Sequence, residues 1–287
     1  MPRRIAILGV GLIGGSFALA LRQAVPDVFI VGYDRDEVNL AAARQLGVID
    51  RGTAALAQAV QEADLILMAV PVGQMPLLFE QMRPHLNPAA VITDVGSTKV
   101  TLVEMARAHL GEAITRFVPG HPIAGAELSG VRAAHPDLFR ERTVVLTPLA
   151  ETSSMSYEWV CRCWESCGAK VEQQTVERHD EIFGIVSHLP HLLSFSLVHD
   201  IAVRDDAATL FRHAAGGFRD FTRIAGSNAE MWRDISLANR TVLMAELTRY
   251  QDQLTQLSQW LEERDGAALE EFFKRARDAR RRWQEER

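Results

Sequence analysis

Up to about residue 175, short apolar runs alternate along the chain with longer amphipathic ones. The apolar runs have the length of buried strands, and the longer runs repeat apolar residues with helical spacing. This alternation is typical of a parallel sheet with helices on both faces. The predicted strands are Ile5–Leu8, Val28–Tyr33, Leu65–Val70, Val91–Val95, one near Phe117, Thr143–Thr147 and Lys170–Gln174. The predicted helices are Ser16–Gln23, Glu37–Gln45, Met75–Met82, Val100–His109 and Met155–Ser166.

Beyond about residue 175 the pattern predicts helices only. Long helical stretches cover Val176–Val203 and Ser236–Leu261, and the charged segment Ala267–Arg287 is typical of a solvated helix. We therefore expect an α/β protein of two domains. An N-terminal Rossmann-type parallel-sheet domain covers residues 1–174, and an all-helical domain covers residues 175–287. The apolar stripe of the second long helix predicts that the helical domain closes a substrate cleft and forms a homodimer.

A glycine motif lies between the first predicted strand and the first predicted helix. Gly9, Gly11 and Gly14 stand in the order G-x-G-x-x-G, with Leu12 and Ile13 between the last two. The first glycine permits a tight turn, the second lets a pyrophosphate approach the backbone, and the third lets helix and strand pack closely. The pyrophosphate then lies at the positive end of a helix. We therefore assign all five residues to a dinucleotide-binding site.

An acidic residue ends the second predicted strand, where a dinucleotide site needs one. Asp34 follows Gly14 by 20 residues. Its carboxylate is suited to accept hydrogen bonds from a ribose hydroxyl and repels a 2′-phosphate, so we expect NAD as the cofactor. Arg35 beside it is suited to bind such a phosphate, so NADP stays an alternative. Val70 and Pro71 follow another strand at the carboxyl edge of the sheet and are assigned to the same site.

The composition limits the class of partner. The 287 residues are 47% apolar and 24% charged, which is ordinary for a globular protein, and the net charge of −6 does not suit nucleic acid. A signal peptide and a run of about 18 apolar residues are both missing from the sequence, so we expect a cytoplasmic protein without a membrane partner. Cys161, Cys163 and Cys167 lie in one predicted helix with no fourth ligand nearby. We expect them to be packing residues rather than a metal site.

Four further segments, the last two taken together, carry polar groups where a packed core would not place them. They are Asp94–Lys99 (D-V-G-S-T-K), Gly120–Glu127 (G-H-P-I-A-G-A-E), and the pair Ser187–His191 (S-H-L-P-H) and Gly217–Arg223 (G-F-R-D-F-T-R). Together with the glycine motif, these segments make the sequence similar to the prephenate dehydrogenase family. This family of tyrosine biosynthesis includes arogenate and cyclohexadienyl dehydrogenases. The resemblance extends over nearly the whole chain, and its motifs are specific in combination.

The resemblance implies an NAD-dependent oxidative decarboxylation of prephenate to 4-hydroxyphenylpyruvate. A hydride leaves the ring carbon that bears the 4-hydroxyl, and the ring carboxylate leaves as carbon dioxide while the ring becomes aromatic. Such a reaction needs a base near the hydroxyl and cations for two carboxylates. Arogenate, with an amino group in place of the keto group, is the alternative substrate, and an enzyme that accepts both is a further alternative.

The resemblance also implies roles for single residues. His121 matches the family histidine that contacts the 4-hydroxyl, and its place in a G-H-P segment predicts a loop close to the substrate. Histidine suits this role because its ordinary pKa lies near working pH. Ser97 matches a serine that shares the contact, and it also stands where a helix N-cap is expected. Arg223 matches an arginine that pairs with the ring carboxylate, for which a guanidinium fork is suited.

Five other residues match the substrate site of the family. His191 matches a histidine that contacts the substrate side chain, and His188, one helical turn earlier, is interpreted as a supporting residue. Glu127 and Asp220 match acids that gate the cleft by ion pairing, and Trp232 matches an aromatic residue near the pocket. For these last three, a surface or packing role stays open.

Two other classes of protein combine a Rossmann domain with helices. β-Hydroxyacid and imine reductases use a lysine on a helix, but the lysines of this chain are Lys99, Lys170 and Lys274. None of them stands as an obvious base on the helices of the second domain. A nucleotide-sensing regulator is expected to have a degraded substrate site, whereas the serine, histidine and arginine residues assigned above are all present. Both classes are therefore less favoured than a dehydrogenase.

Overall fold

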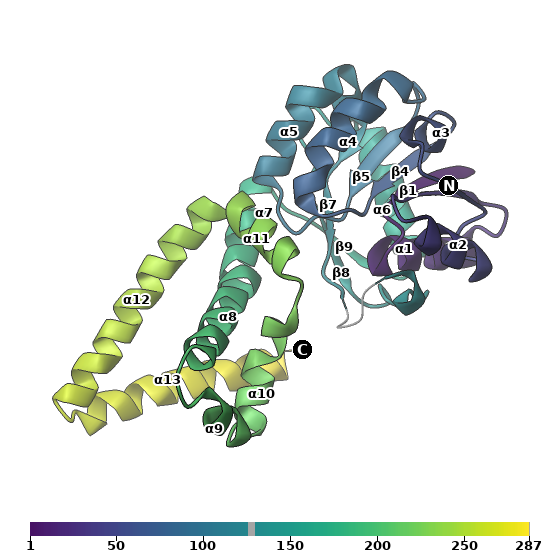
Figure 1. The fold of residues 1–287 in the computed structure, drawn as a ribbon. Helices are drawn as coiled ribbons and strands as arrows, with labels where there is room; N and C mark the ends of the chain where they lie inside the picture. The colour runs from purple at the N-terminus through teal and green to yellow at the C-terminus, as the bar shows by residue number, and fades with distance from the viewer. Residues whose placement is uncertain (126–129, 287) are drawn as a thin grey trace. The chain divides into compact units, whose positions relative to one another are not determined.

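The computed structural model describes residues 1–125 and 130–286. The chain forms two compact units, Met1–Arg240 and Thr241–Arg287. A six-stranded parallel sheet lies at the centre of the first unit, with its strands in the order β3-β2-β1-β4-β5-β6 (Figure 1). The strands are β1 (Arg4–Leu8), β2 (Phe29–Tyr33), β3 (Arg51–Thr53), β4 (Leu65–Met68), β5 (Val91–Asp94) and β6 (Phe117–Val118). This is the strand order of a dinucleotide-binding fold, whose switch point lies between β1 and β4.

Helices cover both faces of this sheet. One face carries α1 (Leu12–Ala24), α2 (Glu37–Gln45) and α6 (Ser154–Ser166), and the other carries α3 (Leu56–Val60), α4 (Met75–Met82) and α5 (Val100–Leu110). Phe17 and Trp164 pack edge to face in the first layer, with ring centroids 4.7 Å apart. Phe79 and Phe117 do so in the second layer, at 5.4 Å. The predicted α/β architecture is confirmed. The elements β3 and α3 were not expected, because the three residues of β3 form no apolar run and the five residues of α3 are too few for a helical period to show.

A second sheet of three strands holds β7 (Gly120–Pro122), β8 (Thr143–Leu146) and β9 (Lys170–Gln173). The strands β8 and β9 agree with the prediction. The segment around His121, however, was expected to be a loop, and it is a strand that pairs antiparallel with β8. Glycine and proline flank the histidine and favour turns, but pairing with β8 supplies the backbone hydrogen bonds of a strand. Pro122 is tolerated because it ends β7.

The helices of the C-terminal half begin with α7 (Val176–Phe183), a π-helical turn at Gly184–His188 and α8 (Leu189–Ala202). They continue with α9 (Ala207–Arg212), α10 (Gly216–Thr222), α11 (Ala229–Ala238), α12 (Arg240–Glu262) and α13 (Gly266–Glu285). Short 3-10 turns cover Val72–Gln74, Arg83–His85, Gly111–Arg116, Val131–Ala133 and Arg223–Gly226. Within the second unit, the rings of Trp260 and Phe272 are 5.9 Å apart, and α13 buries none of its residues.

One expectation for this half was wrong. Ser236–Leu261 is not one helix, because α11 ends before Asn239 and α12 begins after it. The side chain of Asn239 is buried and makes hydrogen bonds to residues distant in the chain, which fixes the break. In addition, one helical stretch among the described residues, Val176–Ala202, is long and apolar enough to cross a membrane by length and composition alone. Its polar residues include His188 and Ser194, which are buried within the protein.

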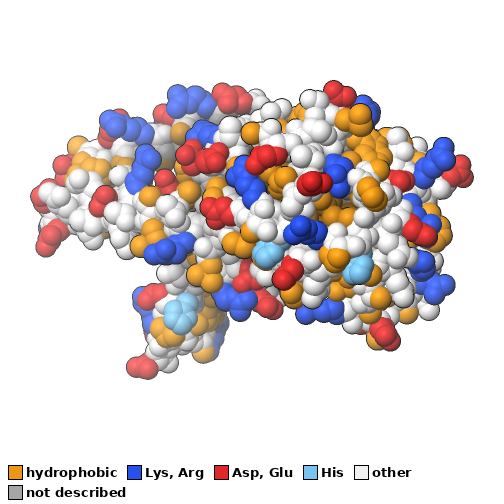
Figure 2. Space-filling model, turned by 90° about the horizontal axis from the view of Figure 1, so that it is seen from above, with side chains coloured by type: hydrophobic (Ala, Val, Ile, Leu, Met, Phe, Trp, Pro, Cys, Tyr) orange, Lys and Arg blue, Asp and Glu red, His pale blue; other side chains and the backbone are white. Residues whose placement is uncertain are grey.

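Charged side chains of both signs are interspersed over the face shown in Figure 2. The net charge of −6 is thus not concentrated in one area of that face. Any binding of an anion therefore has to depend on a few cations placed within a site rather than on the field of the whole surface.

Candidate active site

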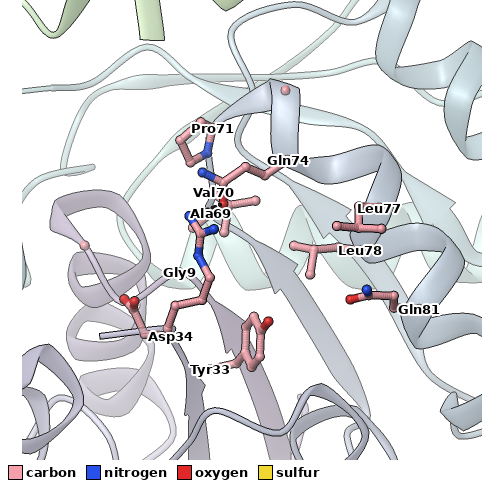
Figure 3. A pocket seen from close by; sticks show the side chains of 13 residues that line it. Gly9, Tyr33, Asp34, Ala69, Val70, Pro71, Gln74, Leu77, Leu78 and Gln81 are labelled. Carbon is pink, nitrogen blue, oxygen red and sulfur yellow. Dashed lines mark hydrogen bonds between the residues drawn. The ribbon is translucent and has the colours of Figure 1, made fainter. Parts of the chain in front are cut away.

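A pocket with a cavity volume of about 410 Å³ opens at the carboxyl ends of β1, β2 and β4. Figure 3 shows its residues, which come from the turns that follow these three strands and from α4. The residues that line it are Gly9, Gly11, Tyr33, Asp34, Arg35, Ala69, Val70, Pro71, Gly73, Gln74, Leu77, Leu78 and Gln81. Ligands of open α/β sheets bind outside the carboxyl ends of the strands at the switch point, which is where this pocket lies.

The three glycines of the motif have different surroundings. Gly9 has a φ of +96°, and a Cβ there would stand 2.5 Å from the carbonyl oxygen of Ala69. A Cβ on Gly14 would stand 2.3 Å from the carbonyl oxygen of Gly9, so strand and helix approach closely. A Cβ on Gly11 would have no described heavy atom within 4 Å. Gly11 precedes α1 without a side-chain cap, which leaves the N–H groups of the helix for a pyrophosphate.

The expected cofactor residues divide into two groups. Those that line the pocket are Gly9, Gly11, Asp34, Arg35, Val70 and Pro71. Those that do not line it are Leu12, Ile13 and Gly14. Leu12 and Ile13 pack their side chains against the core of the sheet. Their part in the motif is therefore to hold the first turn of α1 on the sheet.

Asp34 is half-buried at the end of β2 and held by two hydrogen bonds. Its Oδ1 accepts from the backbone N–H of Asp36 at 3.0 Å, and its Oδ2 accepts from the amide Nδ2 of Asn39 at 2.8 Å. The same Nδ2 donates to the carbonyl oxygen of Val10 at 2.9 Å. Asn39 therefore ties the carboxylate to the glycine turn. A carboxylate has about four acceptor positions, so capacity remains for ribose hydroxyls.

The far side of the pocket was not predicted from the sequence. Figure 3 shows Leu77, Leu78 and Gln81 on α4, across the pocket from Tyr33. These side chains form a largely apolar wall, which suits the flat base of an adenosine. Leu77 is 57% exposed, and the apolar pattern of α4 does not distinguish it from the leucine of the buried face beside it.

Arg35 is exposed and reaches across the same pocket. Its Nη2 donates to Oε1 of Gln74 at 3.3 Å. The guanidinium of Arg35 is thus bound to the neutral amide of Gln74 rather than to a carboxylate. It lines the same pocket as Asp34, whose carboxylate is suited to a ribose diol.

A second cluster of polar residues is built on the turn after β5. Asp94 is fully buried, and its Oδ1 accepts from the N–H of Gly120 at 3.0 Å. Its Oδ2 accepts from the N–H of Gly96 at 2.7 Å and from Nζ of Lys99. Burial lowers the pKa of Lys99, while the carboxylate of Asp94 acts in the opposite direction. This ion pair joins the β5–α5 turn to the start of β7 and so positions His121.

His121 belongs to a row of three side chains. Its Nδ1 lies 2.9 Å from Nε2 of His179, and Nδ1 of His179 lies 2.8 Å from Oδ1 of Asp180. The carboxylate of Asp180 also accepts the backbone N–H of Lys99 at 2.8 Å and that of Val100 at 2.9 Å. His179 and Asp180 come from α7, so the row connects strand β7 with the first of the C-terminal helices (Figure 1).

The cap of α5 differs from the prediction. Ser97 is half-buried in the turn and does not cap the helix, whose N-cap position is Lys99. The N–H groups at this helix end are accepted by Asp180, 81 residues after Lys99. The sequence predicted Ser97 as the N-cap because capping rules consider only residues close to the helix end along the chain. The hydroxyl of Ser97 is therefore not committed to the helix end.

His121 is a neutral imidazole. Burial lowers its pKa well below the ordinary value of 6.5, and the charges of His179, Lys99 and His188 lower it further. The proton needed to charge the ring is therefore bound only in acid. At working pH His121 keeps one bare nitrogen, which is what a proton acceptor requires.

His188 lies in the π-helical turn and is buried. Its Nδ1 is 3.0 Å from Nδ2 of Asn239, and the same Nδ2 donates to the carbonyl oxygen of Asp180 at 2.8 Å. Burial lowers the pKa of His188 to about 4, and the backbone of Ser97 lies beside its ring. Sequence reasoning missed His179, Asp180 and Asn239. No local pattern in the sequence marks these three residues, because hydrogen bonds between residues 51 to 81 positions apart bring them into the site.

His191 and Trp232 form a stacked pair. Their ring centroids are 3.5 Å apart with an interplanar angle of 19°, and Trp232 is 8% exposed. Nδ1 of His191 donates to the carbonyl oxygen of Ser187 at 2.9 Å. Burial lowers the pKa of His191, and the charge of nearby Arg223 lowers it as well. The structure thus brings together three of the predicted substrate residues, which come from α8, α11 and the turn after α10.

Two predicted acids are not placed in this cluster. Asp220 is exposed on α10, and Glu127 lies outside the described residues. Cys163 and Cys167 are buried in the core, Cys161 is half-buried against it, and burial raises the pKa of Cys163 to about 12. In the described part of the chain, no group of three or more histidine, cysteine or acidic side chains is placed to hold a metal ion.

Comparison with known proteins identifies the family. Residues 17–173 match the nucleotide-binding domain of prephenate dehydrogenase, and residues 175–275 match its dimerisation domain. The chain belongs to the prephenate dehydrogenase family. Since the first match begins after Gly14, it does not depend on the glycine motif. The protein is accordingly an NAD-dependent oxidoreductase, as the sequence predicted.

Relatives match along almost the full chain. The cyclohexadienyl dehydrogenase of Zymomonas mobilis is 36% identical over 97% of this chain and 95% of its own. The prephenate dehydrogenase of Bacillus subtilis is 36% identical over 98% of this chain and 76% of its own. A crystal structure of prephenate dehydrogenase from A. aeolicus, in complex with hydroxyphenyl propionate and NAD+, superposes with a TM-score of 0.90. It is 36% identical, and 97% of each chain is covered.

Proposed function

We propose that this chain oxidises and decarboxylates prephenate, with His121 as the group that accepts the proton of the 4-hydroxyl. One observation carries the assignment: a neutral imidazole, held at one nitrogen by His179, lies at the start of β7 next to the turn after β5. That turn is at the carboxyl end of a sheet strand, which is also the edge on which the cofactor pocket opens. Membership of the family supports the same reaction.

Bound NAD supplies the acceptor for the hydride. The imidazole of His121 takes the proton of the 4-hydroxyl while the carbon–oxygen bond gains double-bond character. Ser97 offers a second hydrogen bond that orients the same hydroxyl. The guanidinium of Arg223 pairs with the ring carboxylate until this group leaves as carbon dioxide. The electron pair of the broken carbon–carbon bond enters the ring, and the oxygen takes its proton back from His121 to form the phenol.

Arogenate is a second candidate substrate, and the hydrogen bond of His191 favours it. Because Nδ1 of His191 donates to a backbone carbonyl, the neutral ring has an acceptor at Nε2. An acceptor suits the ammonium group of arogenate. The keto group of prephenate needs a donor at this position, and the ring supplies one at Nε2 only when it is protonated. The resemblance to a cyclohexadienyl dehydrogenase is consistent with either substrate.

We also propose that residues 175–287 act as a helical domain that closes the cleft and forms a homodimer, with the N-terminal domain ending at residue 174. The match of residues 175–275 to a dimerisation domain supports this division. The proposed substrate is a small dicarboxylate, and the proposed location is the cytoplasm, as for a biosynthetic enzyme of this family.

Steady-state assays test the proposed reaction. The near-ultraviolet absorbance of the reduced nicotinamide is followed with prephenate and arogenate, each with NAD and with NADP. We expect turnover of at least one substrate with NAD. In His121→Asn, kcat falls by about 10²–10⁴, the range for a positioned base, while NAD affinity is unchanged. His199→Asn, on the exposed side of α8, is the matched control. Retention of most of the kcat by His121→Asn would assign the proton transfer to another group.

A further inference from the structure

The second nitrogen of His121 has a buried partner to which the proposed reaction gives no role. His179 is fully buried, and its Nε2 lies 2.9 Å from Nδ1 of His121. The ring of Phe183 packs against both imidazoles, with centroid distances of 4.8 Å to His121 and 4.6 Å to His179. This cover separates the contact between the two imidazoles from solvent, so the protein rather than water determines where the shared proton lies.

The direction of each hydrogen bond follows from Asp180. Its Oδ1 and Oδ2 each accept a backbone N–H group at the start of α5, so both oxygens act as acceptors. An ionised carboxylate accepts only, so the proton of the 2.8 Å contact belongs to Nδ1 of His179. Burial lowers the pKa of His179, which is therefore neutral and has a bare Nε2. That nitrogen accepts from its neighbour, which places the proton of His121 on Nδ1.

We propose that His179 and Asp180 are positioning residues that hold His121 in the tautomer with a bare Nε2. This inference rests on the proposed role of His121 as proton acceptor. In the reaction, the O–H bond of the substrate breaks and an Nε2–H bond forms. The Nδ1–H of the resulting imidazolium stays hydrogen-bonded to His179, whose own Nδ1–H is held by the carboxylate of Asp180. The positive charge of the His121 imidazolium is thus stabilised by the acceptor nitrogen of His179 and, through that ring, by the carboxylate of Asp180.

The remaining charges near the histidine row do not replace this support. Lys99 is paired with Asp94, and both side chains are fully buried. The ring of His188 is turned to Asn239, which donates to its Nδ1 and to the backbone of Asp180. The charges of Lys99 and His188 lower the pKa of His121. Asp180 is thus the one acid, within the described residues, that the hydrogen bonds connect to the His121 ring.

Two variants at position 179 separate positioning from packing. His179→Phe keeps a ring of similar size and removes the acceptor. His179→Gln keeps an acceptor, because its amide oxygen reaches the place of Nε2. We expect kcat of His179→Phe to fall about 10- to 100-fold, the scale of one hydrogen bond to a charged group, with KM changed less than about threefold. His179→Gln recovers most of this loss. His199→Phe, the same change at an exposed site, keeps the wild-type kcat.

Nitrogen-15 NMR of the histidine rings reads the tautomer directly and needs no turnover. We expect the Nδ1–H form of His121 in the free wild-type protein, and a mixture with the Nε2–H form in His179→Phe. An Nε2–H form in the wild type would refute the inference, as would an unchanged kcat in His179→Phe. If the wild type turned over neither substrate, the proposed function would be wrong. The nitrogen-15 spectrum would still show whether His179 and Asp180 fix the tautomer of His121. If His179→Phe did not fold, the wild-type spectrum and His179→Gln would decide.

Discussion

The buried ion pair between Asp94 and Lys99 makes a sharp prediction about stability. Asp94→Asn keeps the shape of the side chain but only one of its two acceptor oxygens, so either Gly96 or Gly120 loses the acceptor of its backbone N–H. It also removes the hydrogen-bonded counter-charge of the Lys99 ammonium. Both side chains of the pair are fully buried. Removal of one partner of a buried pair costs about 3–5 kcal/mol, a large part of the roughly 5–15 kcal/mol that stabilises a typical domain. The midpoint of thermal unfolding should fall by roughly 6–20 °C, at about 2–4 °C per kcal/mol for a unit of this size.

The pH dependence of this loss identifies its cause. Burial lowers the pKa of Lys99 from 10.5, and Asp94 opposes that shift, so Asp94→Asn lowers the pKa further. Between the lowered pKa and 10.5, the unfolded chain binds more protons than the folded one, and stability rises with pH. The deficit of Asp94→Asn should therefore shrink by about 1.4 kcal/mol for each unit by which its Lys99 pKa lies below that of the wild type.

Urea and thermal unfolding over a series of pH values measure both effects. Asp200→Asn is the matched control, because Asp200, on α8, forms an exposed ion pair with Arg204, which follows the helix. Such surface pairs contribute less than about 1 kcal/mol. The reasoning is refuted if Asp94→Asn is no less stable than Asp200→Asn, or if its deficit stays constant as the pH rises.

Further predictions concern the two binding sites and the assembly. Asp34→Ser should weaken the preference for NAD over NADP, because Arg35 then meets a phosphate without a competing carboxylate; ratios of kcat/KM for the two cofactors measure this. The acidic limb of kcat/KM should lie below pH 6.5, because activity is lost only as His121 gains a proton at its lowered pKa. A limb above that pH would contradict it. Arg223→Ala should raise the KM for the substrate by about 10- to 100-fold, the scale of a charge-assisted hydrogen bond. Light scattering should give twice the mass of the chain.

The sequence alone determined the cofactor half of this protein. Strand and helix patterns depend on neighbouring residues, so the elements up to Lys170–Gln173 were readable from periodicity, except the short β3, α3 and β7. The glycine motif was readable for the same reason. Gly9 and Gly14 are needed because a Cβ at either would collide with backbone a few ångströms away, a constraint that belongs to any strand-turn-helix of this kind.

The polar network around His121 was decided by the tertiary structure. Its contacts join residues 58 positions apart, from His121 to His179, and 81 positions apart, from Lys99 to Asp180. A hydrogen bond between such distant residues leaves no periodic trace in the sequence, so Asp180 was not recognised as the cap of α5. Asn239 breaks a helix whose apolar stripe continues past it, because its buried amide satisfies two acceptors that only the folded chain presents. Local patterns thus specify the elements, while burial of polar groups specifies how the catalytic histidine is held.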